Sequence, residues 1–441
     1  MYQKSVKQIQ PEISGETKMI DSKTADLYTE IIKEELIPAM GCTEPISLAY
    51  AAAAARKTLG ALPERTTVTV SGNIIKNVKS VIVPHTGGMR GIETAAAIGF
   101  IGGNADKELE VLSDVTEKQI SELRDYLKKA KFTVKQSESD RLFEIVIEAE
   151  AKGHTASVTL LDGHTNITEI TKDGSVIFSA ECLHKEKPKA DRRMLSVKDI
   201  VSYAEETSLD GVKEILDRQI EYNTAIAREG LSGNWGASIG RIILKANGNS
   251  VGNRAKAWAA AGSDARMNGC ELPVVINSGS GNQGMTASLP VIVYAEELNV
   301  SKEQLYRALL ISNLVTVHLK TGIGCLSAYC GAISAGCGAG AGITYLYGGR
   351  FTEIAHTIVN AVAINSGVVC DGAKASCAAK IASAVEAGLL GMNMYMHGRE
   401  FYGGDGIVNS GIEETIENVA ALARNGMRET DREILKIMLK Q

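Results

Sequence analysis

Cysteine placement is the feature of this 441-residue chain that could carry chemistry most directly. Five of its eight cysteines fall between positions 325 and 377, namely Cys325, Cys330, Cys337, Cys370 and Cys377, and Cys42 lies far upstream. Free thiols in a reducing compartment are suited to metal binding or to catalysis. Three thiolates on an iron–sulfur cluster, with a fourth acting as a base or a ligand, would make the protein a lyase.

The pair Cys370 and Cys377 is seven residues apart. In a straight helix this is two turns, or about 10 Å of rise, which is long for two ligands of one cluster. Gly372 would let a loop fold the first cysteine back before a helix starts, and Cys330 in the other glycine-rich stretch is a candidate third ligand. The alternative is that these cysteines are small buried apolar residues. Their spacing matches neither common zinc nor common ferredoxin runs, so an isolated pair of this kind favours burial.

An iron that three protein thiolates leave open would be a Lewis acid. It could hold the hydroxyl or thiol leaving group of an amino acid while a base removes the α-proton. This combination describes a β-elimination.

The run 277–284 (NSGSGNQG) follows a short apolar stretch, 272–276, that reads as a strand. Its glycines would let backbone N–H groups approach an anion closely, and its Asn and Gln side chains add donors. We expect a substrate carboxylate to bind here. The alternative is a plain turn.

The same run allows a rival interpretation. Ser-Gly-Asn is similar to the carboxylate loop of pyridoxal-phosphate β-eliminating enzymes, and Lys256 upstream would be the Schiff-base lysine. Lys256 lies within a helical pattern, however, and no second glycine-rich cup for the phosphate is evident.

The segment 84–90 (PHTGGMR) joins a predicted strand to a helix of small residues. His85 is a candidate proton carrier and Arg90 a candidate partner for a carboxylate. The alternative for a single histidine in a loop is an exposed residue without a function.

Composition limits the class of protein. Apolar residues make up 44% and charged residues 22%, and the formal net charge of −5 gives no reason to expect nucleic acid or a membrane surface as a partner. The first 25 residues lack an apolar signal-peptide core. The uncharged stretch 321–349 consists mostly of Gly, Ala, Ser and Cys, so we interpret it as buried helix rather than a membrane span. We expect a cytoplasmic protein.

The elements that must position these residues follow from hydrophobic periodicity. Residues 1–22 are predicted to be a flexible arm, and 23–60 to be helices that pack on the catalytic domain. Gly41 to Pro45 interrupts them, with Thr43 or Glu44 capping the second helix and Pro45 at its first position. Cys42 would then precede a helix N-terminus, where the helix dipole favours a thiolate.

The rest of the chain is predicted as two further regions. Residues 61–185 read as an α+β domain with a helix at 116–131 and strands at 66–70, 80–83, 143–149, 156–160 and 175–178. Residues 190–441 read as a helical domain. The predicted fold class is therefore α+β, a large helical catalytic domain with an inserted smaller α+β domain.

Four motifs together are familiar. The runs 41–45 (GCTEP), 83–88 (VPHTGG), 277–284 and 370–377 (CDGAKASC) resemble the L-cysteine desulfidase family, and the resemblance extends from about residue 25 to the C-terminus. The second half also resembles the α part of iron–sulfur L-serine dehydratases. Residues 64–180 resemble a shortened form of their β part.

The resemblance implies an oxygen-sensitive 4Fe–4S cluster with one open iron in a helical domain. It implies conversion of L-cysteine and water to pyruvate, ammonia and hydrogen sulfide through an aminoacrylate, without pyridoxal phosphate. By position, Cys330, Cys370 and Cys377 would ligate the cluster, Cys42 would be the base or a displaceable fourth ligand, and His85 would lie in an active-site loop. The expected substrate-binding residues are Thr43, Glu44, Arg90, Asn277, Ser278, Ser280, Asn282 and Gln283. A homodimer is the expected assembly.

Other functions remain open at this point. The serine-rich loop of the dehydratases is replaced here by the run 41–45, which favours a thiol substrate over serine without proving it. L-Serine dehydration at the same site is the first alternative, a pyridoxal-phosphate lyase the second, and an iron–sulfur sensor without enzymatic activity the third.

Overall fold

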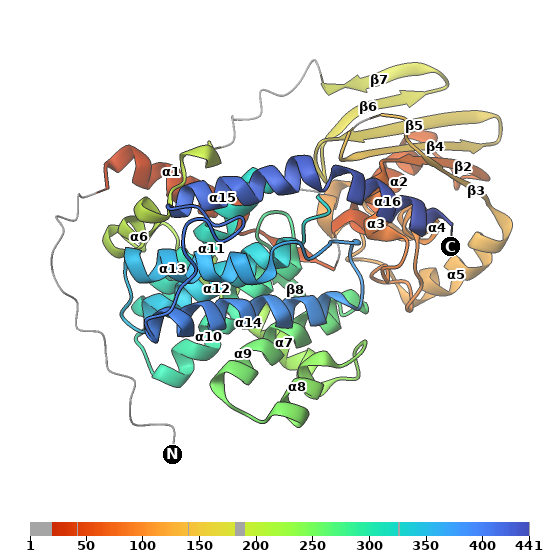
Figure 1. Ribbon diagram of the computed structural model, residues 1–441. Coiled ribbons are helices and arrows are strands. Elements are labelled where there is room, and N and C mark those ends of the chain that lie inside the picture. The colour runs from red at the N-terminus through yellow and green to blue at the C-terminus, as the bar shows by residue number, and fades with distance from the viewer. Residues whose placement is uncertain (1–19, 42, 140, 181–189, 325–326, 441) are drawn as a thin grey trace.

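One part of the protein is built from packed helices and another contains a sheet (Figure 1). Each part holds one of the two main clusters of buried apolar side chains. The computed structural model describes residues 20–41, 43–139, 141–180, 190–324 and 327–440. The fold is a mixture of helices and strands, as the sequence predicts. The smaller cluster is built from one stretch of chain that interrupts the larger one, together with a helix near the C-terminus.

The part of the protein that contains the larger cluster consists mainly of helices. They are α1 (Ser22–Glu35), α6 (Val197–Glu206), α7 (Lys213–Ser232), α8 (Ile239–Asn247), α9 (Val251–Met267), α10 (Gly281–Leu298), α11 (Lys302–Ile323), α12 (Gly331–Leu346), α13 (Phe351–Asn365), α14 (Cys377–Met396) and α15 (Ile412–Ala421). Small residues let these helices approach closely. A Cβ atom added at Gly336 in α12 would lie 2.3 Å from the backbone oxygen of Ala384 in α14. The high glycine and alanine content thus allows the backbones of neighbouring helices to contact each other directly.

The uncharged stretch 321–349 contains the end of α11, the cysteine-bearing connection and α12, whose side chains are almost all buried by neighbouring helices. Among the described residues we find no helix with the length and apolarity needed to cross a bilayer.

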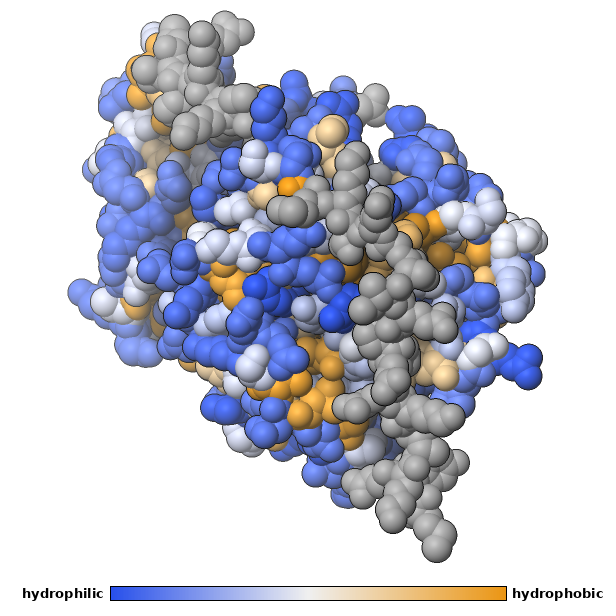
Figure 2. Space-filling view, turned by 90° about the vertical axis from the view of Figure 1, so that its left-hand side faces the viewer, coloured by the Kyte–Doolittle hydropathy of each residue, from blue (hydrophilic) through white to orange (hydrophobic). Residues whose placement is uncertain are grey.

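On the end of the molecule formed by α1 and α6, the hydrophobic side chains of the described residues show as separate patches on a mostly hydrophilic surface (Figure 2).

The smaller cluster surrounds a six-stranded sheet with the order β3-β2-β4-β5-β6-β7. Only β2 and β3 run parallel to each other. The strands are β2 (Arg65–Val70), β3 (Lys131–Gln136), β4 (Glu144–Ala151), β5 (His154–Leu161), β6 (Ile167–Lys172) and β7 (Ser175–Ser179). The helices of this part are α2 (Thr43–Leu59), α3 (Gly72–Val78), α4 (Ile92–Gly102) and α5 (Glu117–Lys129), followed at the C-terminus by α16 (Arg428–Leu439).

The predicted elements differ from this sheet in two respects. The expected strand at 80–83 is a single bridge between Ile82 and Arg90, because Pro84 and a left-handed His85 (φ 54°) turn the chain back at once. The strands β3 and β6 were not predicted. Their side chains are only partly buried, so they lack the regular apolar alternation that reveals a half-buried strand.

The two N-terminal helices belong to different clusters. Tyr28 and Ile31 of α1 are buried in the helical cluster, as expected. Leu48 of α2 lies in the other cluster, where α2 contacts α4, β4 and β5. The structure therefore differs from the expectation that all helices of 23–60 pack on the helical domain. The α2 helix begins at Thr43, and Pro45 occupies its third position.

A short antiparallel pair of strands links the connection between α1 and α2 to the helical part of the protein. Strand β1 (Pro38–Met40) pairs with β8 (Pro273–Val275), with Pro38 opposite Val275. Because β1 leads into α2 and β8 leads into the loop 277–280, this pair places the start of α2 near the glycine-rich loop.

Candidate active site at the seam between the two cores

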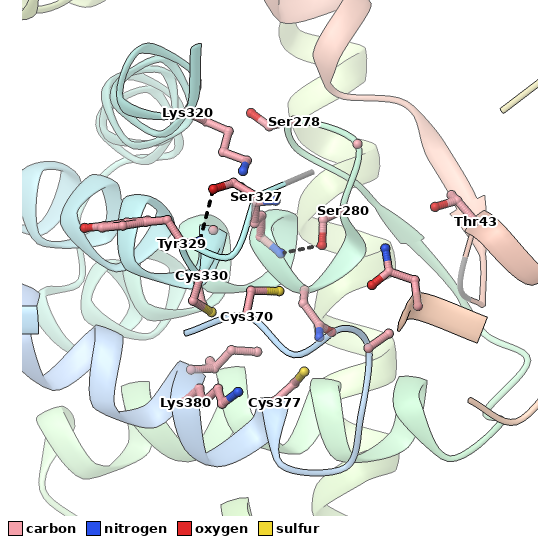
Figure 3. A pocket seen from close by; sticks show the side chains of 18 of the residues that line it. Thr43, Ser278, Ser280, Lys320, Ser327, Tyr329, Cys330, Cys370, Cys377 and Lys380 are labelled. Atoms are coloured by element: carbon pink, nitrogen blue, oxygen red, sulfur yellow. Dashed lines mark hydrogen bonds between the residues drawn. The ribbon is translucent and has the colours of Figure 1, made fainter. Parts of the chain in front are cut away.

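A cavity of about 120 Å³ lies where the two clusters meet (Figure 3). Both parts of the chain line it. The α+β part contributes Thr43, Glu44, Lys76 and Asn77, and the helical part contributes Arg266, Ser278, Gly279, Ser280, Asn282, Gln283, Lys320, Ser327, Tyr329, Cys330, Gly331, Ala332, Cys370, Ala373, Cys377, Lys380 and Ile381. We refer to it as the thiol cavity.

Four helices begin at the wall of the thiol cavity. Thr43 starts α2, Cys330 is the residue before α12, Cys377 starts α14, and Ser280 precedes α10. The first turn of each helix has N–H groups without intrahelical acceptors and carries the positive end of the helix dipole. Four such ends around one cavity favour anions, including thiolates and carboxylates.

Cationic side chains strengthen this preference. Lys76, Arg266, Lys320 and Lys380 line the cavity, whereas Glu44 is the only carboxylate among its described lining residues. Lys76 is 2% exposed and forms an ion pair with Asp431 of α16. The cavity is therefore built to hold negative charge.

A bridge between two loops brings Cys330 and Cys370 together. Tyr329 pairs with Val369, the Cys330 N–H donates to the Val368 carbonyl at 3.0 Å, and the Cys370 N–H donates to the Ala328 carbonyl at 2.6 Å. The Cys330 thiol donates to the Cys370 sulfur, which lowers the pKa of Cys370 and raises that of Cys330. Positive charge nearby, from Lys76 first, lowers the pKa of Cys370 further.

Cys377 reaches the same cavity from the start of α14. Its sulfur accepts from the Lys374 N–H at 3.4 Å and contacts the Gly372 carbonyl at 3.5 Å. Burial raises the pKa of this thiol, and the Lys374 N–H opposes the effect. In Figure 3 the side chains of Cys330, Cys370 and Cys377 are grouped on one side of the cavity.

Gly372 makes this arrangement possible. Its φ is +93°, and an added Cβ atom would lie 2.2 Å from the Lys76 carbonyl oxygen. Only glycine allows the loop 370–376 to contact α3 so closely. The sequence prediction of a glycine-dependent loop followed by a helix describes this segment correctly.

The glycine-rich loop serves both the fold and the cavity. Ser278 (φ 49°) and Gly279 (φ 75°) form a tight turn, and the Ser280 hydroxyl accepts from the Gln283 N–H at the start of α10. The Ser278 N–H already donates to Glu35 at 3.0 Å. Asn277 is fully buried, hydrogen-bonds to Asn313 and does not line the cavity, so it supports the loop from behind.

Arg266 is a cavity residue that the sequence analysis missed. It is 5% exposed, its Nε atom has no partner among the described residues, and its Nη1 lies 3.4 Å from the Asn282 Oδ1. Gln283 lines the same cavity, is 6% exposed, and its Oε1 likewise has no described partner. One signal was present in the sequence, namely an arginine that continues an alanine-rich helix otherwise suited to burial.

The start of α2 contributes two of the predicted substrate-binding residues. Glu44 accepts hydrogen bonds from Asn77 at 2.9 Å and from the Thr43 hydroxyl at 3.1 Å. Thr43 and Glu44 both line the cavity. Cys42, the predicted base, and Cys325 lie outside the described residues.

His85 and Arg90 are not brought into the cavity. The His85 Nδ1 lies 3.3 Å from Glu271, and its Nε2 is buried with no partner among the described residues. Arg90 is exposed, and neither residue lines the cavity.

Lys256 and two interior cysteines also lie elsewhere. Lys256 forms an ion pair with Glu386 of α14 at 2.6 Å and does not line the cavity, which removes support from the pyridoxal-phosphate alternative. Cys337 is enclosed within α12, where burial raises its pKa to about 12. Burial also raises the pKa of Cys270.

The three cavity thiols have the donor chemistry of an iron–sulfur site. Among the described residues, no three His, Cys, Asp or Glu side chains surround one point closely enough to hold a single metal ion. A cubane cluster does not require this, because each of its cysteine ligands binds a different iron. Three soft donors on the wall of one anion-attracting cavity therefore fit a cluster better than a single ion.

Comparison with known proteins shows which family the chain belongs to. Residues 106–436 match the family described as serine dehydratase alpha chain. The chain belongs to this family. This confirms the predicted relationship to the α part of iron–sulfur serine dehydratases.

Close relatives cover nearly the whole chain. A UPF0597 protein of Desulfitobacterium hafniense is 57% identical over 415 residues, which is 94% of this chain and 96% of that protein. A UPF0597 protein of Lachnoclostridium phytofermentans is 51% identical, over 93% of this chain and 98% of that protein. A UPF0597 protein of Treponema denticola is 47% identical, over 96% and 99%.

Proposed function

We propose that the protein is a carbon–sulfur lyase, an L-cysteine desulfidase that converts L-cysteine and water to pyruvate, ammonia and hydrogen sulfide. The observation that supports this most is the meeting of Cys330, Cys370 and Cys377 in one cavity that is surrounded by helix N-termini and cations. Membership in a dehydratase family supports β-elimination as the type of reaction.

We propose a 4Fe–4S cluster as the cofactor, held by these three thiols. When bound, it would supply an open iron as a Lewis acid for the leaving group. The positive charge of Lys76 and Lys320 lowers the pKa of Cys370 and so favours its thiolate. The helix N-termini at Cys330 and Cys377 would favour the thiolate form of these two sulfurs when the cluster binds.

The remaining cavity residues suit an amino acid in its zwitterionic form. The unpaired guanidinium edge of Arg266 would donate to the α-carboxylate, and the first-turn N–H groups of α10 would add to this. The unpaired Oε1 of Gln283 would accept a hydrogen from the α-ammonium group. One substrate would thus satisfy two buried polar atoms, a donor and an acceptor, that have no partner among the residues that the structure describes.

Cys42 would remove the α-proton or act as a displaceable fourth ligand of the cluster. Its two neighbours support this role. Thr43 lines the cavity, and Gly41 is so close to Pro84 that an added Cβ atom would lie 2.5 Å from its ring. Cys42 itself lies outside the described residues, and its candidacy rests on its sequence position directly before a cavity-lining residue.

L-Serine dehydration is the second candidate, and the family match favours it directly. The same carboxylate and ammonium contacts would bind serine. What separates the two substrates is the leaving group, a thiol or a hydroxyl.

The test is a product assay under anaerobic conditions with reconstituted protein. L-Cysteine and L-serine are added separately, and pyruvate, ammonia and hydrogen sulfide are measured. We expect pyruvate and hydrogen sulfide in equal amounts from cysteine and much slower release of pyruvate from serine. Pyruvate from serine alone would replace the proposal with a dehydratase.

Cys42→Ala isolates the role of the base in the same assay. We expect this variant to bind as much iron as the wild type and to lose most of its turnover. Full activity of Cys42→Ala would refute the assignment of Cys42 as the base.

A further inference from the structure

A second cavity, of about 500 Å³, adjoins the thiol cavity. The two share Ser327 in their linings. Lys76 lines the first and Asp431 lines the second, so the ion pair between them stands in the partition. The second cavity lies between the start of α3 and the start of α16, which are in contact beside the sheet (Figure 1).

Basic residues outnumber acidic residues in the described lining of the second cavity. Asp431 is the only carboxylate among its described lining residues, and Lys76 already neutralises it. The four cations are Arg141, Arg424, Arg428 and Arg432. We call this space the arginine cavity.

Arg428 is the member of this group that the fold does not explain. Arg141, Arg424 and Arg432 form ion pairs with Asp162, Glu417 and Glu429. Arg428 has no ion pair or side-chain hydrogen bond with the described residues, and it is the first residue of α16. A cation at a helix N-terminus opposes the helix dipole. The two carboxylates of this turn, Glu429 and Asp431, already pair with Arg432 and Lys76, so neither is paired with Arg428.

Asn73 at the start of α3 gives an independent indication of a ligand. It lines the arginine cavity, is 6% exposed, and its Oδ1 has no partner among the described residues. A buried acceptor of this kind is normally satisfied, so a hydrogen-bond donor is expected to occupy the space beside it. An α-amino acid carries both complements, a carboxylate for the arginines and an ammonium group for Asn73.

We propose that the arginine cavity is a pre-binding site for small carboxylate-bearing amino acids, from which they pass to the thiol cavity. The thiol cavity is small and lies at a buried seam, so its ligand needs a route from solvent. The positive charge of Arg428, which has no ion pair among the described residues, would concentrate anions at that route. This inference rests on the proposed function only for the identity of the amino acid.

The first test does not depend on turnover. Metal-free full-length protein is alkylated with iodoacetate, which is anionic, and in parallel with iodoacetamide, which is neutral. The rates at Cys330, Cys370 and Cys377 are measured by peptide mass spectrometry. The ratio of the two rates reports how strongly the route to the thiol cavity favours an anion.

Arg428→Glu should lower this ratio about 4-fold at low salt, because two units of charge change about 10 Å from the path of the reagent. Arg428→Glu combined with Arg141→Glu should lower it about 10-fold, and 0.5 M salt should remove most of the difference. Arg428→Gln is a milder variant with about half of the effect on a logarithmic scale. Glutamate at the start of a helix is compatible with folding.

The control is Arg399→Glu, which reverses another exposed arginine that lines neither cavity. Its ratio should equal that of the wild type. An unchanged ratio in both Arg428→Glu and the double variant would overturn the proposal, as would an equal decrease in Arg399→Glu.

A second test uses the reconstituted enzyme with L-cysteine. Arg428→Glu should lower kcat/KM about 4-fold and leave kcat unchanged, since the arginine cavity acts before the chemical step. Absence of any turnover in the wild type would contradict the proposed function, whereas the alkylation ratio would still decide the role of the arginine cavity. A decrease in kcat alone would overturn the pre-binding role.

Discussion

Cys377 and Cys337 lie on neighbouring helices, α14 and α12, yet their surroundings differ in kind. Cys377 stands at a helix N-terminus, on the wall of a cavity with cations. Cys337 is in the middle of a helix and is enclosed by apolar residues, which raises its pKa to about 12. A thiol on the wall of the thiol cavity is available to a ligand, whereas a thiol inside the helical core only fills space between packed side chains.

The same contrast holds for the basic side chains. Arg266 is buried at the cavity and its Nε atom has no partner within the described part of the chain, whereas Lys256 is neutralised by Glu386 at 2.6 Å. A polar group left without a partner at a cavity is ready for a ligand, because folding has already removed it from water. Each prediction below compares a residue of the cavity, or of the helical interior, with a matched residue elsewhere.

The largest effect is expected for loss of a cluster ligand. Cys377→Ala should abolish stable iron binding after anaerobic reconstitution and reduce turnover below detection. The reason is that the two remaining thiols would not hold a cluster stably. Cys337→Ala is the matched control in the next helix and should keep the iron content of the wild type. Iron and acid-labile sulfide per chain are the quantities to measure. Equal iron content in the two variants would contradict the assignment of Cys377 as a cluster ligand and of Cys337 as a packing residue.

Arg266→Gln should lower kcat/KM for L-cysteine about 100-fold, which corresponds to about 3 kcal/mol for a charged hydrogen bond to the carboxylate. The iron content should not change, since Arg266 is not one of the proposed cluster ligands. Lys256→Gln, which removes a partly buried cation that lines neither cavity, should change kcat/KM less than about 3-fold. Steady-state kinetics under anaerobic conditions measure both, and a larger effect from Lys256→Gln would reverse our assignment.

Gly372→Ala should lower the free energy of unfolding by about 3 kcal/mol, because it adds a steric clash with the Lys76 carbonyl to the strain of a positive φ. Gly367 supplies the matched control. Its φ is +98° and an added Cβ atom would meet nothing within 4 Å, so Gly367→Ala should cost only about 1 kcal/mol. Urea denaturation curves give both values, and equal losses would show that the contact between the loop 370–376 and α3 contributes nothing.

The buried carboxyl group of Asp264 in α9 should make stability depend on pH. Burial raises its pKa to about 6 from the usual value of 3.8 for an aspartate, so between these pH values the folded state holds a proton that the unfolded state has released. The stabilisation is complete below about pH 4 and is lost as the pH rises through 6, a change on the order of 3 kcal/mol. Asp264→Asn should remove this dependence.

Urea midpoints between pH 4 and pH 8 test the effect of Asp264. The difference in stability between Asp264→Asn and wild type should increase with pH and level off above pH 7. Asp210→Asn, at an exposed position, should follow the wild type throughout. A constant difference across this range would mean that Asp264 does not titrate as its burial implies.

The sequence predicted local features of the site well and its assembly less well. Gly372 and the spacing of Cys370 and Cys377 predicted a loop followed by a helix, because φ preference and helix starts are local properties. The meeting of four helix N-termini was not predictable in this way, since the helices are far apart in the chain and their packing decides where they begin to face one another. Arg266 was missed for the same reason.

Two further differences have physical causes. His85 and Arg90 follow a strand-like run that suggested an active-site loop, but the positive φ of His85 turns the chain so that its ring meets Glu271. The α2 helix packs on the sheet rather than on the helical domain. Its apolar residues are mostly alanines, which suit close packing against either layer and so do not specify a partner.

The central proposal is that L-cysteine loses hydrogen sulfide at the thiol cavity, with an iron–sulfur cluster held by Cys330, Cys370 and Cys377 as cofactor. The most direct measurement is made on anaerobically reconstituted protein, in which iron and acid-labile sulfide per chain are determined before L-cysteine is added and hydrogen sulfide and pyruvate are followed. We predict about four iron atoms per chain and equal amounts of the two products. Protein that binds no iron after reconstitution, or that binds iron and releases no hydrogen sulfide from L-cysteine, would contradict the claim.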